Sequence, residues 1–171
     1  EQRKTSAGIG FVPTMGALHD GHRSLIERAK SDNILIVCSI FVNPTKFNDA
    51  KDYQAYPISI EKDIAMLIDA GCDLLFLPSQ EEMYPDGFDS VPTYDFGYLD
   101  TVLEGAQRPG HFKGVGQIVG RLLDIIHPDY LYMGQKDYQQ CMVVKMLIHL
   151  IGIDNDVKLI ICPIIREADG L

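Results

Sequence analysis

The feature that most constrains the fold is the alternation of short, continuous apolar runs with longer segments of helical periodicity. Unbroken runs rich in β-branched residues are typical of strands covered on both faces. The runs predicted to be strands are Ile9–Val12, Ile34–Val42, Asp73–Leu77, Tyr130–Met133 and Val157–Ile165. The segments predicted to be helices are His22–Lys30, Ile60–Ala70, Phe112–Ile126 and Tyr138–Ile151. Strands alternating with helices predict an α/β fold with a doubly wound, mostly parallel five-stranded sheet and helices on both faces.

Two segments depart from this regularity. Residues 85 to 111 are rich in Pro, Gly and Asp and are expected to be the least regular part of the chain. The helix predicted over Phe112–Ile126 contains Gly114, Gly116 and Gly120, which lower its helix propensity. Packing or close approach of another part of the backbone must compensate for these glycines.

Length and composition favour a single domain over residues 1–171. The 171 residues are 46% hydrophobic, which is enough for a substantial core. A formal net charge of −9 disfavours a non-specific nucleic-acid binder, because such proteins neutralise phosphates with surplus Lys and Arg. No apolar run approaches the roughly 20 residues that span a membrane, and the start "EQRKTSAG" does not resemble a signal peptide. We therefore expect a soluble, cytoplasmic protein with no nucleic-acid or membrane partner.

The cysteines fit this expectation. Cys38, Cys72, Cys141 and Cys162 are far apart in the sequence and form no C-x-x-C motif. We interpret them as reduced residues of the core, as in a reducing compartment, rather than as disulfides or a zinc site.

Chemically distinctive stretches follow four of the five predicted strands. "PTMGALHDGH" follows the first strand, "NPTKF" the second, "GQKDYQQ" the fourth and "READG" the fifth. In open α/β sheets, ligands bind beyond the carboxyl ends of the strands. We expect these stretches to converge on one edge of the sheet.

The first of these stretches has features of a phosphate site. Gly16 permits a tight turn, and Gly21 allows a ligand to approach the backbone where a helix begins. The free N–H groups of a helix N-terminus favour an anion. His19 and His22, three residues apart, can both point toward such an anion and stabilise a departing pyrophosphate. The alternatives are a helix-capping pair of surface histidines and, since no third His or Cys is nearby, a less favoured metal site.

The same stretch resembles the H-x-G-H signature of the nucleotidyltransferase superfamily, which has a Rossmann-like fold. The segments "FVPTMGALHDGH", "FVNPTKF", "LEGAQRPGHFKGV", "GQKDYQQ" and "CPIIREADGL" occur in the order found in the pantoate–β-alanine ligases. By this resemblance the chain is identified as a member of that family, over Gly10 to Leu171. The resemblance implies an ATP-dependent ligase that joins pantoate to β-alanine through a pantoyl adenylate, releasing pyrophosphate and AMP.

The resemblance also implies roles for particular residues. It assigns catalytic roles to His19, His22 and Lys136. It places ATP against Pro13, Thr14, Met15, Gly16, His19, Gly21, His22, Gly134, Lys136 and Asp137. It places pantoate against Met15, Asn43, Lys46 and Gln140. Lys136 would neutralise phosphate charge, with an ordinary surface lysine as the alternative.

A magnesium ion is implied as well. Asp63 and Asp137 match the family positions associated with Mg²⁺, which usually takes one or two carboxylates and several waters. Asp63 lies within the predicted helix Ile60–Ala70, so the alternative is a solvated surface carboxylate.

Three residues of the irregular segment match the family without an assigned chemistry. Glu104, Arg108 and His111 belong to "LEGAQRPGHF", which lies near the active site in the family. An ion pair of Glu104 with Arg108 that tethers a loop is an equally good interpretation.

The chain departs from the family pattern at Lys46, where the family usually has glutamine. Lysine lacks the carbonyl acceptor of glutamine but adds a charge that can pair with the pantoate carboxylate. The family also continues, after "DGL", into a smaller C-terminal lid domain that the 171 residues do not include. Without the lid we expect weak ligand binding and poor turnover.

Other functions remain open at this stage. Another nucleotidyltransferase would share H-x-G-H but would not need "FVNP" or "GQKDYQQ". A catalytically inactive nucleotide-binding or oligomerisation module is a second alternative. A fragment of an aminoacyl-tRNA synthetase is disfavoured by the acidic charge. The resemblance implies a homodimer, although no sequence pattern demonstrates one.

Overall fold

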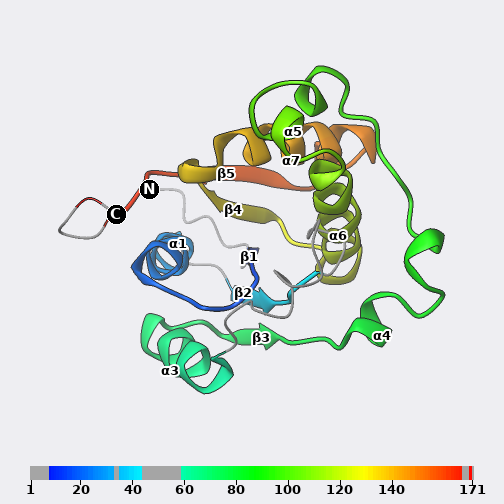
Figure 1. Cartoon of the computed structure of the whole chain (residues 1–171). Helices are drawn as coiled ribbons and strands as arrows, with labels where there is room; N and C mark the ends of the chain where they lie inside the picture. Colours follow the sequence, from blue (N-terminus) through cyan, green and yellow to red (C-terminus); the bar gives the residue numbers. More distant parts are fainter. Residues whose placement is uncertain (1–7, 33–34, 44–58, 167–169, 171) are drawn as a thin grey trace.

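The computed structural model describes residues 8–32, 35–43, 59–166 and 170. Five strands form one sheet in the order β3-β2-β1-β4-β5, and every neighbouring pair is parallel (Figure 1). The strands are β1 (Ile9–Thr14), β2 (Leu35–Ile40), β3 (Leu74–Phe76), β4 (Tyr130–Gly134) and β5 (Lys158–Cys162). The predicted five-stranded parallel sheet is confirmed.

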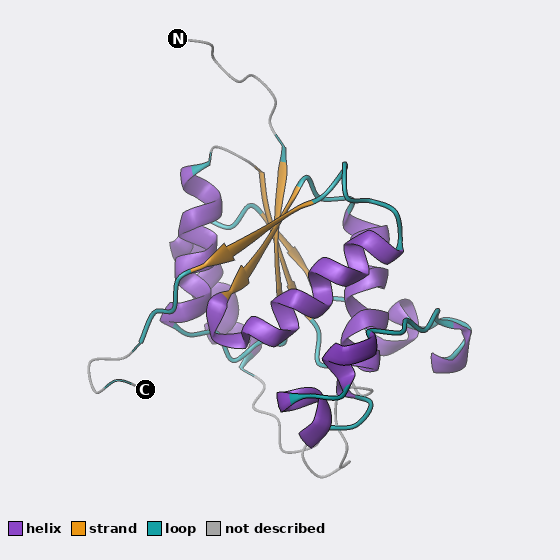
Figure 2. Cartoon of the chain, turned by 90° about the horizontal axis from the view of Figure 1, so that it is seen from above, coloured by secondary structure: helices purple, strands orange, loops and turns teal. Residues whose placement is uncertain are grey.

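Helices cover both faces of this sheet. The helices are α1 (Asp20–Ser31), α3 (Ile60–Ala70), α4 (Gln80–Met83), α5 (Leu103–Gln107), α6 (His111–Ile126) and α7 (Tyr138–Leu150). Short 3-10 turns are η2 (Phe88–Ser90), η3 (Gly97–Asp100) and η4 (Gln135–Asp137). Helices α1 and α3 lie on one face and α6 and α7 on the other, as Figures 1 and 2 show from two directions. The doubly wound arrangement is therefore also confirmed.

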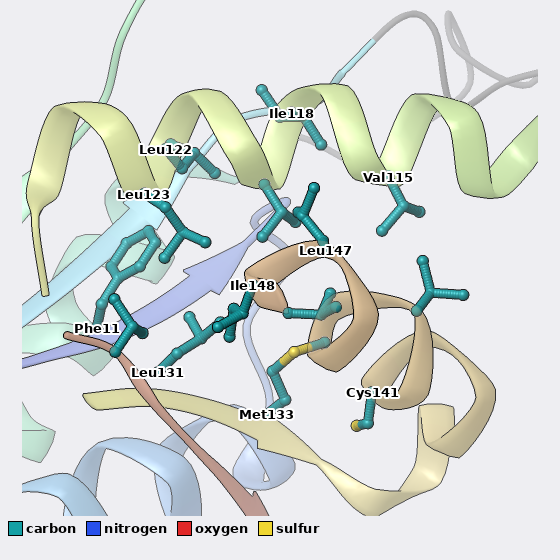
Figure 3. Packing of buried hydrophobic residues seen from close by; sticks show 14 of the residues in the cluster. Phe11, Val115, Ile118, Leu122, Leu123, Leu131, Met133, Cys141, Leu147 and Ile148 are labelled. Atoms are coloured by element: carbon teal, nitrogen blue, oxygen red, sulfur yellow. The ribbon is translucent and has the colours of Figure 1, made fainter. Parts of the chain in front are cut away.

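A separate apolar cluster lies on each face of the sheet. Phe11 and Val12 are adjacent and fully buried, and they belong to different clusters because successive strand residues point to opposite faces. On the α6 and α7 face, the buried side chains include Phe11, Val115, Ile118, Leu122, Leu131, Met133, Leu147 and Ile148 (Figure 3). On the α1 and α3 face they include Val12, Leu25, Ile26, Ile36, Cys38, Leu67 and Tyr132. The unbroken apolar strands are thus explained by burial on both sides.

The glycines of α6 are explained by close packing of the irregular segment. A Cβ atom on Gly116 would lie 2.7 Å from Cζ of Phe96, and one on Gly120 would lie 3.2 Å from the hydroxyl of Tyr94. Both aromatic side chains lie against α6, and Phe96 is 1% exposed. Of the two predicted alternatives, side-chain packing is therefore the one found at Gly116 and Gly120.

Most boundaries differ from the prediction by one to three residues, and one helix was missed. Strand β5 ends at Cys162, three residues before the predicted end, because Pro163 has no N–H for a strand ladder. Helix α1 begins at Asp20 rather than His22. Helix α5 lies within the segment predicted to be the least regular and was not anticipated.

The strand order determines where a site can form. Strand β1 lies between β2 and β4, so the chain winds in opposite directions on the two sides of β1. Such a reversal leaves a crevice beyond the carboxyl ends of the two central strands. Here those ends are Thr14 of β1 and Gly134 of β4.

Candidate functional site

A cavity of about 380 Å³ opens at the carboxyl ends of β1 and β4. Its lining comes from four separate parts of the chain. The predicted residues in this lining are Pro13, Thr14, Met15, His19, His22, Asn43, Glu104, Arg108, His111, Lys136, Asp137 and Gln140. Three of the four distinctive stretches therefore converge, as expected from the strand ends.

The remaining predictions lie elsewhere. In the fourth stretch, Arg166 is outside the cavity and bonds to the carbonyl of Gly170. Lys46 lies outside the described residues, so its proposed contact with pantoate stays a prediction. A larger cavity of about 790 Å³ lies against α6 and ahead of β4 and β5, and it contains none of the predicted site residues. We take the smaller cavity as the candidate site, because the chemistry-bearing side chains converge there.

The two histidines cap helix α1 and also line the cavity. His19 is the N-cap residue, and its Nδ1 accepts a hydrogen bond from the backbone N–H of Gly21 at 3.1 Å. Nδ1 of His22 accepts one from the backbone N–H of His19 at 3.4 Å. A ring nitrogen that accepts a hydrogen bond carries no proton, so in the neutral ring the proton is on Nε2. The capping interpretation is thus correct, and it leaves both Nε2–H groups as donors toward a ligand.

Gly21 is needed for this arrangement. A Cβ atom at position 21 would lie 2.8 Å from Cε1 of His19. The space that a side chain would occupy is taken by the His19 imidazole ring, whose centroid is 4.2 Å from that of His22. Gly21 thus makes room for His19, and the approach of a ligand to its backbone stays a prediction.

His22 is held in its neutral form. Its pKa is lowered from 6.5 to about 4, chiefly because burial disfavours the charged ring. Proximity to His19 and Lys136 lowers the pKa further, while Asp63 acts in the opposite direction. At neutral pH His22 is therefore an uncharged donor.

The turn between β1 and α1 is held by Asp63. Its two carboxylate oxygens accept hydrogen bonds from the backbone N–H groups of Ala17 (2.9 Å) and Leu18 (2.8 Å). A Cβ atom on Gly16, which has φ of 83°, would lie 3.0 Å from the same carboxylate. Asp63 is 2% exposed, so the alternative of a solvated surface carboxylate is wrong.

The two carboxylates predicted to bind magnesium differ in their fit. Asp137 lines the cavity and its side chain is 58% exposed. Asp63 lines a different cavity, and both of its oxygens already accept backbone hydrogen bonds. Among the residues that the structure describes, no cluster of three or more His, Cys, Asp or Glu side chains could hold a metal ion. Asp137 fits a magnesium ion held mainly by phosphates and water, whereas the contacts of Asp63 suit it to shaping the loop.

Several polar residues of the cavity are tied to the fold. The Thr14 hydroxyl donates to the carbonyl of Ser39 at 2.7 Å, which joins the ends of β1 and β2. Asn43 is fully buried and donates to the carbonyl of Gly114 at 3.3 Å. It also accepts a hydrogen bond from the hydroxyl of Tyr84 at 2.9 Å. Tyr84 was missed at the sequence level, since nothing near it in the sequence signals this contact.

Glu104, Arg108 and His111 form one wall of the cavity. Nη1 of Arg108 lies 2.6 Å from Oε1 of Glu104, and Nε2 of His111 lies 3.5 Å from the same oxygen. The expected ion pair is present. It joins residues four apart along one segment, however, so it does not tether the loop to another element. That connection is made by Gln139, which the sequence interpretation missed.

The other predicted residues lie at or after the end of β4, and of these Gly134 does not line the cavity. Lys136 in η4 is 76% exposed and is 3.8 Å from the carboxylate of Asp137. Nothing lies within 4 Å of the position of a Cβ atom on Gly134, which leaves open space against the backbone there. Gln140 lines the cavity, and its side chain makes no hydrogen bond within the described part of the chain.

All four cysteines are free thiols. Cys38, Cys141 and Cys162 are buried, as predicted for core residues, whereas Cys72 is only partly buried, so the prediction is wrong for Cys72. Within the described ranges no helix has the length and apolar character needed to cross a membrane.

Comparison with known proteins relates this chain to one family. The pantoate-β-alanine ligase family model matches residues 1–171. A pantothenate synthetase of Porphyromonas gingivalis is 49% identical over 170 residues, covering 99% of this chain and 58% of the relative. One from Cytophaga hutchinsonii is 48% identical, covering 100% of this chain and 59% of the relative. The chain thus spans less than two thirds of the length of these curated relatives.

Solved structures give the same relationship. The pantothenate synthetase of Thermus thermophilus matches with a TM-score of 0.89 and 48% identity, covering 96% of this chain and 58% of the other. A pantoate-β-alanine ligase of Francisella tularensis, complexed with β,γ-ATP and β-alanine, matches with a TM-score of 0.91 and 48% identity. That match covers 96% of this chain and 62% of the other. The fold is therefore shared with these proteins.

Proposed function

This chain belongs to the pantoate–β-alanine ligase family, and from that premise we propose that it binds ATP and pantoate in an ATP-dependent ligase. In the proposed reaction the pantoate carboxylate attacks the α-phosphate of ATP and displaces pyrophosphate. The amine of β-alanine then attacks the carbonyl of the pantoyl adenylate, and AMP leaves as pantothenate forms. The 171 residues would form the nucleotide- and acid-binding domain of this enzyme.

The observation that carries the proposal is the pair of capping histidines with their Nε2–H groups left as donors. Phosphate oxygens accept hydrogen bonds from such donors, and the N-terminus of α1 adds its partial positive charge. Lys136 adds a full charge at the end of β4. Fixed donors of this kind stabilise charge that develops on a leaving pyrophosphate, because they need no reorganisation during the reaction.

The roles of the other predicted residues follow from their places in the cavity. Pro13, Thr14 and Met15 at the end of β1 lie where nucleotide and acid would meet. The open space beside Gly134 suits adenosine. Gln140 supplies an amide that the protein leaves available, which suits a hydroxyl or carboxylate of pantoate.

A magnesium ion is part of the proposal. When bound, it would offset phosphate charge, and Asp137 is the carboxylate placed to hold it. Asp63 would support the same site by holding the loop that carries His19.

We also propose that the enzyme is a cytoplasmic homodimer. The support for both is the family resemblance, and free, buried thiols fit a reducing compartment.

Calorimetric titration of D-pantoate and a non-hydrolysable ATP analogue tests the proposal. The parent chain, His22→Gln and His149→Gln are compared in the presence of Mg²⁺. His149 is the matched control, because it is exposed, pairs with Asp154 and does not line the cavity. We expect saturable binding of both ligands to the parent and the control, with nucleotide affinity reduced about tenfold or more in His22→Gln. Nucleotide binding without pantoate binding would instead favour a nucleotide-binding module, and equal affinities in all three chains would refute the histidine assignment.

A further inference from the structure

Two adjacent glutamines at the start of α7 have opposite surroundings. The side chain of Gln140 lines the cavity and makes no hydrogen bond with the part of the chain that the structure describes. Gln139 does not line the cavity, and its side-chain amide makes three hydrogen bonds. We propose that Gln139 is a positioning residue that fixes helix α5, and with it the Glu104–Arg108–His111 wall against which the acid substrate binds.

The three hydrogen bonds all go to the backbone that leads into α5. Nε2 of Gln139 donates to the carbonyl oxygens of Leu99 and Val102, each at 2.9 Å. Oε1 accepts from the backbone N–H of Glu104 at 3.0 Å. Both amide hydrogens are therefore used, and the amide spans η3, the connecting turn and the first turn of α5.

These bonds supply a cap that the helix lacks in its own sequence. The N-cap position of α5 is Val102, which has no side-chain acceptor. An N-cap side chain normally accepts from the N–H of the second or third helical residue. Glu104 is the second residue of α5, so Gln139 provides that acceptor from another element.

The turn before α5 needs such support. Leu103 has φ of 47°, a conformation that is unfavourable for a bulky residue. Its side chain is 73% exposed, so burial of that side chain does not offset the strain. The turn is also packed tightly, because a Cβ atom on Gly105 would overlap the carbonyl oxygen of Leu99 and lie 2.9 Å from the Asp100 backbone. Hydrogen bonds from Gln139 and close packing at Gly105 thus hold the same turn.

The consequence for the cavity is direct. Glu104 and Arg108 lie on α5 and its C-terminal cap, and His111 follows at the start of α6. A shift of α5 would move the permanently charged Arg108 guanidinium relative to Gln140 on the facing α7. The histidines that cap α1 belong to a different element and would keep their places.

The test compares Gln139→Leu with Gln140→Leu in the 171-residue chain. The first readout is amide hydrogen exchange, which needs no ligand and so does not depend on the proposed function. We expect the exchange of the Glu104 amide to rise about tenfold or more in Gln139→Leu and to stay at the parent rate in Gln140→Leu. Gly105→Ala, which disturbs the same turn by a different route, should also raise it.

The second readout is ligand affinity, and here the inference rests on the proposed function. We expect the Kd for D-pantoate to rise about tenfold or more in Gln139→Leu, while the Kd for a non-hydrolysable ATP analogue changes less than about twofold, because the histidine site is undisturbed. A loss of overall stability would lower the affinity for both ligands together. A change in pantoate affinity alone therefore identifies a positioning role for Gln139. If the parent binds no pantoate, the proposed function fails while the exchange result still decides whether Gln139 holds α5.

Two outcomes overturn the inference. Unchanged exchange at Glu104 in Gln139→Leu would show that the amide does not hold α5. Faster exchange with unaltered pantoate affinity would show that the position of α5 does not determine acid binding. Should Gln139→Leu not fold, Gly105→Ala still tests the second step, and faster Glu104 exchange with unaltered pantoate affinity in that variant would count against the inference.

Discussion

At the residue scale, the histidines of α1 gain their orientation from the helix that they cap. Nδ1 of each ring accepts a backbone N–H, so the position of the proton and the direction of the ring are set before any ligand arrives. A capping pair and a ligand-binding pair are usually weighed as alternatives. Here the two are compatible, because an imidazole has two nitrogens and the cap uses only one of them.

The low pKa of His22 makes stability depend on pH. The unfolded chain binds a proton at His22 below about pH 6.5, whereas the folded chain binds it only near pH 4. Between these values the unfolded state holds more protons, so the contribution of His22 to the free energy of unfolding rises with pH. It becomes constant above about pH 6.5. Urea unfolding at several pH values should show a steeper decline below pH 6.5 for the parent than for His22→Gln. Parallel curves for the two chains would contradict a depressed His22 pKa.

A substitution at Gly134 should change nucleotide binding without changing the stability of the fold. Nothing lies within 4 Å of a Cβ atom at this position, and its φ of −79° suits any residue. We expect the free energy of unfolding of Gly134→Ala to lie within about 0.5 kcal/mol of that of the parent. We also expect this variant to bind the ATP analogue several-fold more weakly, since the methyl group would occupy the space proposed for adenosine. Thermal unfolding and calorimetry on the same samples check this. Undiminished nucleotide affinity would place the adenosine elsewhere.

At the element scale, the β1–α1 turn depends on a carboxylate from a helix 45 residues away in sequence. Asp63 of α3 accepts the N–H groups of Ala17 and Leu18, and Ala17 itself has φ of 52°. The turn carries the residues that lead to His19, so the loop geometry and the α1–α3 packing form one structural unit.

Asp63→Asn should therefore destabilise the chain. The amide keeps one acceptor oxygen and turns an NH₂ group toward a backbone donor, which leaves a partly buried N–H unpaired at a cost of about 1–3 kcal/mol. Asp69→Asn is the matched control on the same helix, because Asp69 is 68% exposed and pairs with Arg23 at the surface. In chemical denaturation, the free energy of unfolding of that control should fall by less than about 0.5 kcal/mol. An equally small effect of both changes would mean that Asp63 does not hold the turn.

The elements differ in how well their sequences predict them. The five strands and the four long helices are found because burial imposes a period on many residues at once. Helix α5 was missed because it has five residues, a valine at its N-cap and a glycine inside. The residue that supplies its cap, Gln139, is 35 positions further along the chain. Similarly, Asp63 and Tyr84 act through contacts with distant residues, which no local pattern records.

At the scale of the whole molecule, the strand order explains why the candidate site could be located from sequence. Parallel strands bring their carboxyl ends to one edge, and three of the four distinctive stretches line the cavity there. Arg166, which follows the edge strand β5, lies outside it. The particular partners within the site could not be derived in this way. They depend on side-chain directions and on which of the two apolar layers each element joins.

The thiols report on the integrity of both layers. Burial raises the pKa of Cys38 to about 12 and that of Cys141 to about 11, and these residues lie in different clusters. At pH 8 we expect Cys72, which is half-buried, to react first with a thiol reagent, and the other three to react at the rate at which the fold opens. Treating Cys72→Ser with the thiol reagent and measuring its mass would check this. That variant should stay unlabelled until denaturant is added. Rapid labelling of Cys38 in the native variant would contradict the packed layer between the sheet and α1.

The neutral state of His22 has a consequence for how an anion reaches the cavity. The chain has a formal net charge of −9, so at long range it repels a nucleotide. An uncharged N–H group attracts phosphate only over hydrogen-bond distances, which dissolved ions barely screen. Added salt should therefore speed the encounter, by screening the repulsion, and affect the dissociation rate only through the charge of Lys136. In a phosphate site built mainly from lysines and arginines, added salt would slow association instead.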